Sequence, residues 1–298
     1  MITHQHPQPQ KPDRVVVIGA RGFIGKAVHS RLKAESVTVL ALTSDDVDLM
    51  APAAADRLAA AFRPTDAVVM LAALTPDKGR DASTLVKNLV MMQHVCAALE
   101  KSGCAHLVYF SSDAVYPPEL SRVSEETPAS PRDLYGVMHY AREIMARSLA
   151  GMPVLVLRPT LVYGAGDPHR AYGPTEFWRS VREEGKIELR GTSDDMGVEM
   201  RDRIHVADVA ALTVLCLLHR TAGTLNLATG TSRSFREVAD LVASQFAGKI
   251  AVVPTPRKIP ITHRYYDVIN LIEAFPDFRF TSLDEGIRRV HGKTSGTN

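Results

Sequence analysis

The feature that most constrains the fold of this chain is a regular alternation of short apolar runs with longer amphipathic segments. The apolar runs predict strands at 15–18, 37–42, 67–73, 107–111 and 154–157. The amphipathic segments predict helices at 23–35, 53–62, 84–102, 134–149 and about 205–220. Strands joined through helices need crossover connections, so the sheet should be mostly parallel with helices on both faces.

Three glycines separate the first predicted strand from the first predicted helix, in the run VVVIGARGFIGKAV. Gly19 permits a sharp turn, Gly22 lets the backbone approach a pyrophosphate, and Gly25 allows the helix to pack closely on the strand. The N-terminus of the helix attracts negative charge. Because the triplet follows a strand and opens a helix, it predicts dinucleotide binding, with an ordinary glycine-rich turn as the alternative.

The end of the second predicted strand bears on the choice of cofactor. An acidic residue there would hold the ribose hydroxyls of NAD, but the segment reads ALTSDD, with Thr43 and Ser44 at the expected position. Arg21 in the glycine turn can pair with the 2′-phosphate of NADP. These two features favour NADP(H), with NAD(H) as the alternative. Asp48 and Leu49 occupy the place expected for the adenine ring, although Asp48 also suits an ordinary helix N-terminus.

Composition limits the class of protein. The net charge is +2 and the basic residues are scattered, so neither nucleic acid nor a membrane surface is expected as a partner. The longest apolar run, 209–218, is too short to span a bilayer. Three cysteines without CxxC spacing indicate reduced thiols in a cytoplasmic protein. Residues 1–13 predict a disordered lead-in, and the isolated His4 and His6 do not predict a metal site.

The pattern loosens after Arg158, where the segment RPTLVYGAGDPHRAYGPTEF is rich in glycine and proline and indicates loops that carry a site. We therefore expect an α/β architecture: a Rossmann-type doubly wound parallel sheet with a smaller C-terminal substrate-binding lobe. The expected dinucleotide-binding domain covers 14–164 plus about 203–224, and the expected lobe covers about 165–202 and 225–298.

Several motifs, taken in order, resemble the extended short-chain dehydrogenase/reductase family of NAD(P)-dependent nucleotide-sugar epimerases, dehydratases and ketoreductases. They are GARGFIG at 19–25, MLAA at 70–73, Asn88, YFSSDAVYP at 109–117, YGVMHYARE at 135–143, LRPTLVYG at 157–164 and RDRIHVADVA at 201–210. The resemblance covers nearly all of the chain after the first thirteen residues. It implies a nucleotide-sugar substrate.

The resemblance implies that Tyr135 exchanges a proton with the sugar oxygen and that Ser112 hydrogen-bonds the same oxygen. A tyrosine can do this when positive charge lowers its pKa from about 10. The family carries a lysine where this chain has His139, which shares a helical face with Tyr135. Neutral imidazole keeps a hydrogen bond to the nicotinamide ribose but largely loses the charge. We therefore expect slow or alkaline-shifted catalysis, and the alternative is a catalytically weak dinucleotide-binding sensor or regulatory protein.

Asp113 lies where the dehydratases of the family carry an Asp-Glu pair, but Ala114 takes the second place. Dehydration then lacks an acid/base group, which leaves epimerisation or 4-keto reduction. Arg201 matches the family arginine that reaches the substrate diphosphate, and Arg264 is a second candidate whose alternative is an ordinary surface charge. Thr75 is expected to help shape the sugar pocket.

The predicted cofactor-binding residues are Gly19, Arg21, Gly22, Phe23, Ile24, Gly25, Thr43, Asp48, Leu49, Ala72, Tyr135 and His139. The predicted substrate-binding residues are Thr75, Ser112, Asp113, Arg201 and Arg264, and no metal ligand is predicted. The resemblance also implies a homodimer that packs the helix at 84–102 and the tyrosine helix against a second copy. Apolar positions that permit this contact are Val90, Val95, Ala98, Ile144 and Met145.

Overall fold

The computed structural model describes residues 2–169 and 173–295; residues 1, 170–172 and 296–298, which fall in the predicted lead-in and substrate-binding lobe, lie outside the described residues. The chain forms two compact units. The first comprises Met1–Pro118, Glu125–Pro159 and Val209–Leu227, and the second comprises Glu119–Ser124, Thr160–Asp208 and Ala228–Asn298. These bounds differ from the expected ones by a few residues, by the segment Glu119–Ser124, which sequence periodicity did not single out, and by residues 1–13, which belong to the first unit.

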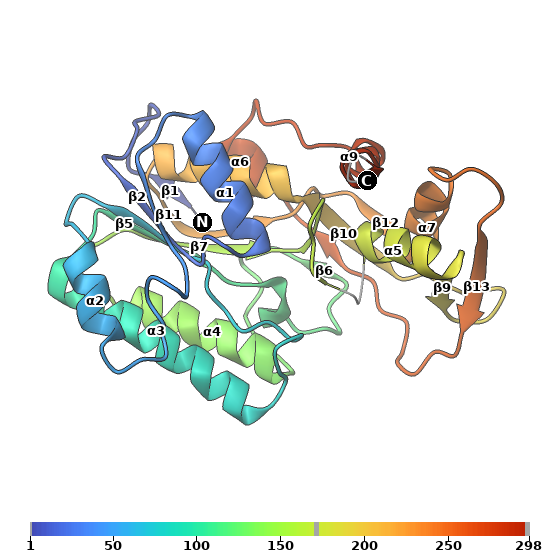
Figure 1. Cartoon of the computed structure of the whole chain (residues 1–298), viewed down its shortest axis with the longest axis horizontal. Helices are drawn as coiled ribbons and strands as arrows, with labels where there is room; N and C mark the ends of the chain where they lie inside the picture. Colours follow the sequence, from blue (N-terminus) through green and yellow to red (C-terminus); the bar gives the residue numbers. More distant parts are fainter. Residues whose placement is uncertain (1, 170–172, 296–298) are drawn as a thin grey trace. The chain divides into compact units, whose positions relative to one another are not determined.

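A seven-stranded sheet in the order β1-β11-β7-β5-β4-β2-β3 forms the centre of the first unit (Figure 1). The strands are β1 (Thr3–His4), β2 (Val15–Ile18), β3 (Val39–Leu42), β4 (Ala67–Met70), β5 (His106–Phe110), β7 (Val154–Pro159) and β11 (Thr221–Leu227). Only β1 pairs antiparallel with its neighbour in this sheet; the other pairs are parallel. The predicted Rossmann-type α/β fold is confirmed.

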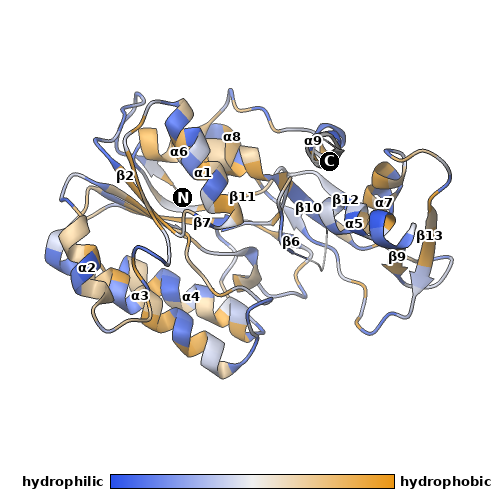
Figure 2. Ribbon diagram, in the orientation of Figure 1, coloured by the Kyte–Doolittle hydropathy of each residue, from blue (hydrophilic) through white to orange (hydrophobic). Residues whose placement is uncertain are grey.

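Helices cover both faces of this sheet, as crossover connections require. They are α1 (Phe23–Ala34), α2 (Ala54–Ala61), α3 (Ala82–Ser102), α4 (Leu134–Arg147) and α6 (Val206–Leu218), with the short 3-10 turn η1 (Asp113–Val115) after β5. Figure 1 shows α1 and α6 on one face and α2, α3 and α4 on the other. Every residue of β2, β4 and β5 is buried, because strands covered on both faces have no solvent side. Figure 2 shows these inner strands as mainly hydrophobic.

The expectation of a disordered lead-in is wrong for its described part. Thr3–His4 forms β1 and pairs with the start of β11. The backbone N–H of His6 donates to the carbonyl of His219 at 3.0 Å, and that of Gln10 donates to the carbonyl of Leu218 at 2.8 Å. The segment is held largely by backbone hydrogen bonds. Such bonds can form with any side chains, so the amino-acid composition does not predict them.

The second unit contains small sheets and helices of its own. Its strands are β6 (Arg122–Val123), β8 (Leu161–Tyr163), β9 (Lys186–Arg190), β10 (Met200–His205), β12 (Ser232–Ser234), β13 (Ala251–Thr255) and β14 (Tyr265–Tyr266). Its helices are α5 (Pro174–Glu184), α7 (Phe235–Ala243), α8 (Ile269–Ala274) and α9 (Leu283–Ser295). Phe177 and Trp178 of α5 pack with Ile187 of β9 and Val238 of α7 in a separate core.

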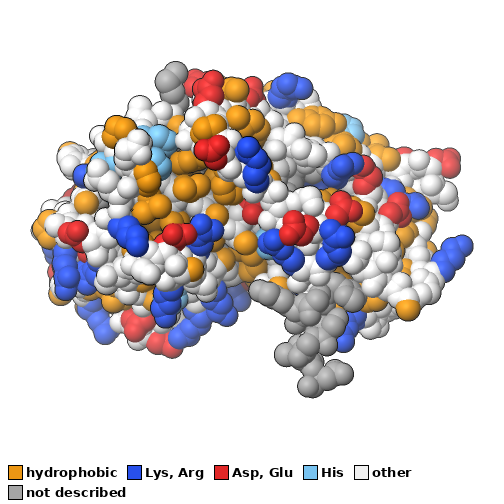
Figure 3. All heavy atoms as spheres, turned by 90° about the horizontal axis from the view of Figure 1, so that it is seen from above, with side chains coloured by type: hydrophobic (Ala, Val, Ile, Leu, Met, Phe, Trp, Pro, Cys, Tyr) orange, Lys and Arg blue, Asp and Glu red, His pale blue; other side chains and the backbone are white. Residues whose placement is uncertain are grey.

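Charged side chains of both signs are mixed across the face seen in Figure 3. Such mixing agrees with the net charge of +2 and gives no broad single-sign surface on that face. Within residues 2–169 and 173–295, no helix combines the length and the apolar character needed to cross a membrane.

Candidate active site

The glycine turn of the first unit is built by close backbone contacts. Gly19 has φ +91°, and a Cβ placed on it would lie 2.8 Å from the backbone nitrogen of Ala72. A Cβ on Gly25 would lie 2.2 Å from the carbonyl oxygen of Gly19, so only glycine lets α1 approach β2 this closely. Gly22 caps α1, whose first turn has no acidic residue. An open, acid-free helix N-terminus of this kind fits a pyrophosphate.

Two acidic residues, Asp45 and Asp46, follow the end of β3. Arg21 forms an ion pair with Asp45, and both side chains are largely exposed. Thr43 donates from its backbone nitrogen, at 2.9 Å, and from its hydroxyl, at 2.8 Å, to the carboxylate of Asp46. The hydrogen bond from Arg21 holds the pKa of Asp45 below its usual value. The acid that appeared to be missing at Thr43 is therefore present two and three residues later.

The other predicted cofactor residues differ in their exposure. Phe23 and Ile24 form the first turn of α1 and are half-buried, and Asp48 is exposed, with a carboxylate that accepts the N–H of Met50 at 2.9 Å. Leu49 is only 7% exposed and packs in the core. The Leu49 side chain consequently has little surface to offer an adenine ring.

Tyr135 and Ser112 are brought together by a glycine. A Cβ on Gly136 would lie 2.2 Å from the carbonyl oxygen of Ala114, so α4 packs directly on η1. Ser112 caps η1 and accepts the N–H of Ala114 at 3.2 Å. Tyr135 comes one residue before Gly136, and the nearby Ser112 hydroxyl lowers the pKa of its phenol. The structure thus brings together the hydroxyl and the phenol that the sequence singled out.

His139 is buried beside the same tyrosine. Its ring meets that of Tyr135 edge-on with centroids 4.6 Å apart, and its Nδ1 lies 2.8 Å from the hydroxyl of Tyr109. Its Nε2 has no partner among the described residues. Burial, followed by the positive charge of Arg142, lowers the pKa of His139 to about 3. The imidazole is therefore neutral at pH 7.

Arg142 is a buried charge that the sequence analysis missed. Its side chain is completely inaccessible, Nη2 donates to the carbonyl of Ala72 at 2.9 Å, and the guanidinium carbon lies 5.3 Å from the centroid of the Tyr109 ring. The signal was present in the spacing, because Tyr135, His139 and Arg142 recur at four and three residues and so share one helical face.

The phenol of Tyr135 is half-buried, and its ionisation is opposed by its surroundings. Burial is the largest influence and raises the pKa of Tyr135 to about 12. Ser112 and Arg142 lower this pKa, whereas the nearby carboxylates of Asp113 and Asp133 raise it. At neutral pH the phenol is protonated and can give up a proton.

A second buried network, also missed, fixes α4 to the sheet. Glu143 accepts from the Ser111 hydroxyl at 2.6 Å and from two nitrogens of Arg158 at 2.9 and 2.7 Å. Arg158 also donates to the Tyr116 hydroxyl at 3.0 Å, which in turn donates to Asn226 at 2.8 Å. Burial would lower the pKa of Arg158, but the bonds with Glu143 more than offset this effect. The network ties the helix that carries Tyr135 to β5, β7 and β11.

The loop after β4 is held by Asn88. Its amide accepts the N–H of Leu74 at 2.9 Å and donates to the Leu74 carbonyl at 3.1 Å. Thr75, the next residue, donates its hydroxyl to Asp77. Asn88 therefore sets the backbone of the segment on which Thr75 lies, while Thr75 satisfies its own hydroxyl locally.

In the second unit, Arg201 and Arg264 both donate hydrogen bonds to the carbonyl of Met200. The guanidinium of Arg201 donates to the carbonyls of Met200 and Thr262 at 2.8 and 2.7 Å, and to the Thr262 hydroxyl at 2.8 Å. The backbone N–H of Arg264 donates to the same Met200 carbonyl at 2.9 Å. Arg264 is 9% exposed, so it is not the surface charge that was its alternative reading.

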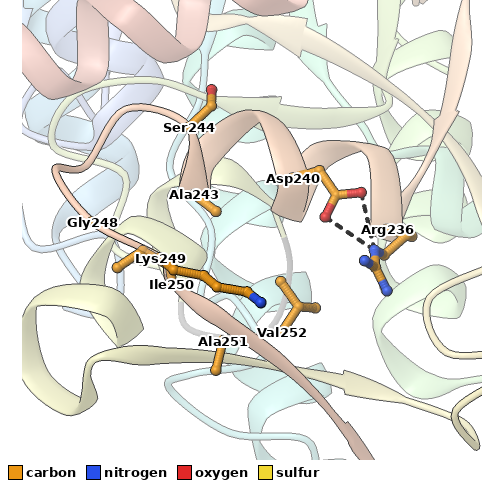
Figure 4. A pocket seen from close by; sticks show the side chains of 9 residues that line it. All are labelled: Arg236, Asp240, Ala243, Ser244, Gly248, Lys249, Ile250, Ala251 and Val252. Carbon is orange, nitrogen blue, oxygen red and sulfur yellow. Dashed lines mark hydrogen bonds and ion pairs between the residues drawn. The ribbon is translucent and has the colours of Figure 1, made fainter.

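A hollow of about 550 Å³ lies between α7 and β13 in the second unit, and Figure 4 shows the side chains that line it. Arg236 and Asp240 on its wall pair with each other at 3.0 Å. None of the predicted site residues contributes to the lining, which also includes Ala243, Ser244, Gly248, Lys249, Ile250, Ala251 and Val252. This hollow therefore gives no support to the predicted chemistry.

Comparison with known proteins bears on the chemistry of these residues. The profile of the NAD dependent epimerase/dehydratase family matches residues 15–228. A dTDP-4-dehydrorhamnose reductase of Mycobacterium tuberculosis is 32% identical over 166 residues, which is 52% of this chain and 52% of that protein.

Several solved structures match nearly the whole chain, among them the two that follow. RMD from Pseudomonas aeruginosa, complexed with NADPH, has a TM-score of 0.81 and 25% identity, with 94% of this chain and 98% of that chain covered. UDP-glucose 4-epimerase from Thermus thermophilus, in complex with NAD, has a TM-score of 0.78 and 25% identity, with 96% and 100% covered. Both cofactor types thus occur among similar structures.

Proposed function

Because this chain belongs to the NAD dependent epimerase/dehydratase family, we propose that it reduces the keto group of a nucleotide-diphosphate 4-keto sugar. The observation that carries the proposal is the close packing of α4 on η1 at Gly136, which puts Tyr135 near Ser112 in the same unit as a glycine turn fit for a dinucleotide. When bound, a reduced nicotinamide supplies the hydride in this chemistry. Epimerisation by the same residues is the second outcome of the assay below.

The state of Tyr135 favours reduction. The protonated phenol gives its proton to the sugar oxygen while Ser112 donates a hydrogen bond to the same oxygen. Removing a hydride from a sugar alcohol, as an epimerase must do first, instead requires the phenolate as base. A pKa raised to about 12 keeps the phenol protonated and disfavours that direction. His139, neutral and with Nε2 unpartnered among the described residues, is proposed to donate to the nicotinamide ribose.

NADP(H) is the proposed cofactor, with NAD(H) as the alternative. Arg21 lies in the glycine turn and is the proposed partner of the 2′-phosphate. Its ion pair with Asp45 is exposed, and exposed pairs open readily, so a phosphate can replace the carboxylate. The structure of RMD complexed with NADPH supports the same choice.

On the substrate side, we propose that Arg201 and Arg264 bind the diphosphate, because guanidinium groups bind phosphate through parallel hydrogen bonds. Thr75 and Asp113 are proposed to contact the sugar. Ala114 leaves Asp113 without a second carboxyl group, and this argues against dehydration as the reaction.

A homodimer in the cytoplasm is the proposed form of the protein. Val86 of α3 and Val137 and Ile144 of α4 are 56%, 39% and 54% exposed, and an apolar surface of this kind suits a second copy. Two positions named earlier for this contact, Val95 and Ala98, are wrong, because both side chains are fully buried in the core. The three cysteines are free thiols, as expected in a reducing compartment.

The decisive experiment incubates the purified protein with 4-keto nucleotide sugars and NADPH or NADH, and follows both cofactor oxidation and the sugar product. Stoichiometric cofactor oxidation is expected, and Tyr135→Phe should lower the rate by about a hundredfold or more. Conversion without net oxidation would identify an epimerase. A full rate in Tyr135→Phe would refute the mechanism.

A second candidate function is a dinucleotide-binding sensor with little catalysis. The neutral imidazole of His139 favours it, because the residue has lost the charge that would assist Tyr135. Tight cofactor binding, combined with no turnover of any nucleotide sugar by the protein or by His139→Lys, would establish this reading and exclude the enzyme.

A further inference from the structure

Arg142 lies on the buried face of α4, three residues after His139 and seven after Tyr135. We propose that Arg142 supplies the positive charge of the Tyr135 site, in the place of an ammonium group at position 139. The inference rests on the proposed function, since it concerns the same proton-exchanging phenol. Arg142 acts as a positioning residue: it stabilises negative charge that develops on Tyr135 and does not itself contact the sugar.

The environment of Arg142 is unusual for an arginine. Its side chain is 0% exposed, and none of the carboxylates in residues 2–169 and 173–295 forms an ion pair with it. Nη2 binds the Ala72 carbonyl at 2.9 Å, Nη1 lies 3.8 Å from the sulfur of Met138, and Nε has no partner in the described structure. A buried charge without a counter-ion is costly, so its presence calls for an interaction that compensates it.

The same cluster contains the group that would gain from this charge. The Arg142 guanidinium lies over the Tyr109 ring at 5.3 Å, the Tyr109 hydroxyl is 2.8 Å from Nδ1 of His139, and the His139 ring is 4.6 Å from that of Tyr135. Neutral His139 cannot stabilise a phenolate by charge. Arg142 can, because a guanidinium stays protonated when buried.

The titratable and polar groups around Tyr135 come from three elements: η1, β5 and α4. The groups that face or influence it are Ser112 and Asp113 beside η1, Tyr109 of β5, and Asp133, His139 and Arg142 of α4 or its cap. Both carboxylates oppose ionisation of the phenol, and the neutral rings carry no charge. Among the influences acting on Tyr135, Arg142 is the cationic one.

A purely structural role is the competing explanation, since Arg142 also anchors the Ala72 carbonyl in the loop against which Gly19 packs. Two variants separate the roles. Arg142→Gln removes the charge but keeps an amide that can donate to a carbonyl, whereas Arg142→Lys keeps the charge. Arg147→Gln is the matched control, because it removes a partly exposed charge from the same helix. The Arg147 guanidinium donates to the Thr224 hydroxyl at 2.8 Å.

The measurement should follow the phenol directly. Tyr135 is replaced by 3,5-difluorotyrosine, whose phenol is more acidic, and phenolate absorbance is recorded against pH in the full-length protein. We expect Arg142→Gln to raise the midpoint by about one pH unit or more. The midpoints of Arg142→Lys and Arg147→Gln should lie within about a few tenths of a pH unit of the parent midpoint. The pH profile of sugar turnover, measured without the fluorine, should move in parallel.

The outcomes are distinguishable. An Arg142→Gln midpoint equal to that of the parent overturns the inference. A raised midpoint in a protein that turns over no nucleotide sugar supports the charge assignment while the proposed function fails. Should Arg142→Gln not fold, the double variant His139→Lys/Arg142→Gln supplies the test: the ammonium group at 139 should replace the lost charge and give the parent midpoint. A midpoint well below that of the parent overturns the inference, because the ammonium group would then add charge where Arg142 had supplied none.

Discussion

Replacing Gly136 by alanine tests the contact that places Tyr135 beside Ser112. In an open helix the change would stabilise the protein by about 0.5–1 kcal/mol, since alanine is the better helix former. Here the new Cβ would lie 2.2 Å from the Ala114 carbonyl oxygen and 2.7 Å from a Pro131 carbon. The helix and η1 would have to separate by roughly 1 Å, and forced overpacking of this kind costs roughly 1–3 kcal/mol. The net expectation is therefore a loss of about 1–2 kcal/mol.

Catalysis should suffer more than stability, because a shift of about 1 Å in reacting groups can cost about a hundredfold in rate. Urea unfolding gives the first quantity, and sugar turnover at saturating cofactor gives the second. Leu134→Ala, at an exposed position in the same turn of α4, is the control and should change the unfolding free energy by less than about 0.5 kcal/mol. A Gly136→Ala protein that is as stable as the parent and turns over at the same rate would refute the reasoning.

Four other changes test separate parts of the structure. His139, with its pKa lowered to about 3, stays neutral in the folded protein while the unfolded chain takes up a proton below about pH 6.5. The free energy of unfolding that neutral His139 contributes is full above about pH 6.5 and falls by about 2 kcal/mol near pH 5. The unfolding free energy of His139→Gln, measured by urea titration, should therefore decrease less than that of the parent between about pH 6.5 and pH 5. Glu143→Gln leaves the Arg158 charge buried and uncompensated, and should lower the unfolding free energy by roughly 3 kcal/mol or more at pH 7. Ile144→Glu should halve the mass found by light scattering without loss of the fold; an unchanged mass would place any dimer contact elsewhere. Arg21→Ala should weaken NADPH binding about tenfold or more and leave NADH binding nearly unchanged in calorimetry, and equal losses for both would contradict NADP selectivity.

Sequence patterns predicted the first unit well because local periodicity and global topology agree there. The strand at Val15–Ile18 has the predicted bounds, and α3 begins two residues before its predicted start. The β1 strand escaped prediction, since its pairing uses backbone groups that any residue has. The ion pair of Glu143 with Arg158 joins a helix to a strand, and its existence depends on how those elements pack.

Arg142 was missed for a different reason, which the neighbouring Glu143 makes clear. Both are charged residues of one helix, and both would ordinarily be assigned to a solvent-facing surface. Folding compensates Glu143 with Arg158 and Ser111, so that charge is explained by structure alone. It leaves Arg142 buried with a carbonyl and a thioether as its polar contacts. Sequence rules that assign charged residues to the surface fail at sites where a protein keeps a destabilising residue for its function. The buried guanidinium of Arg142, without a counter-ion, is such a residue.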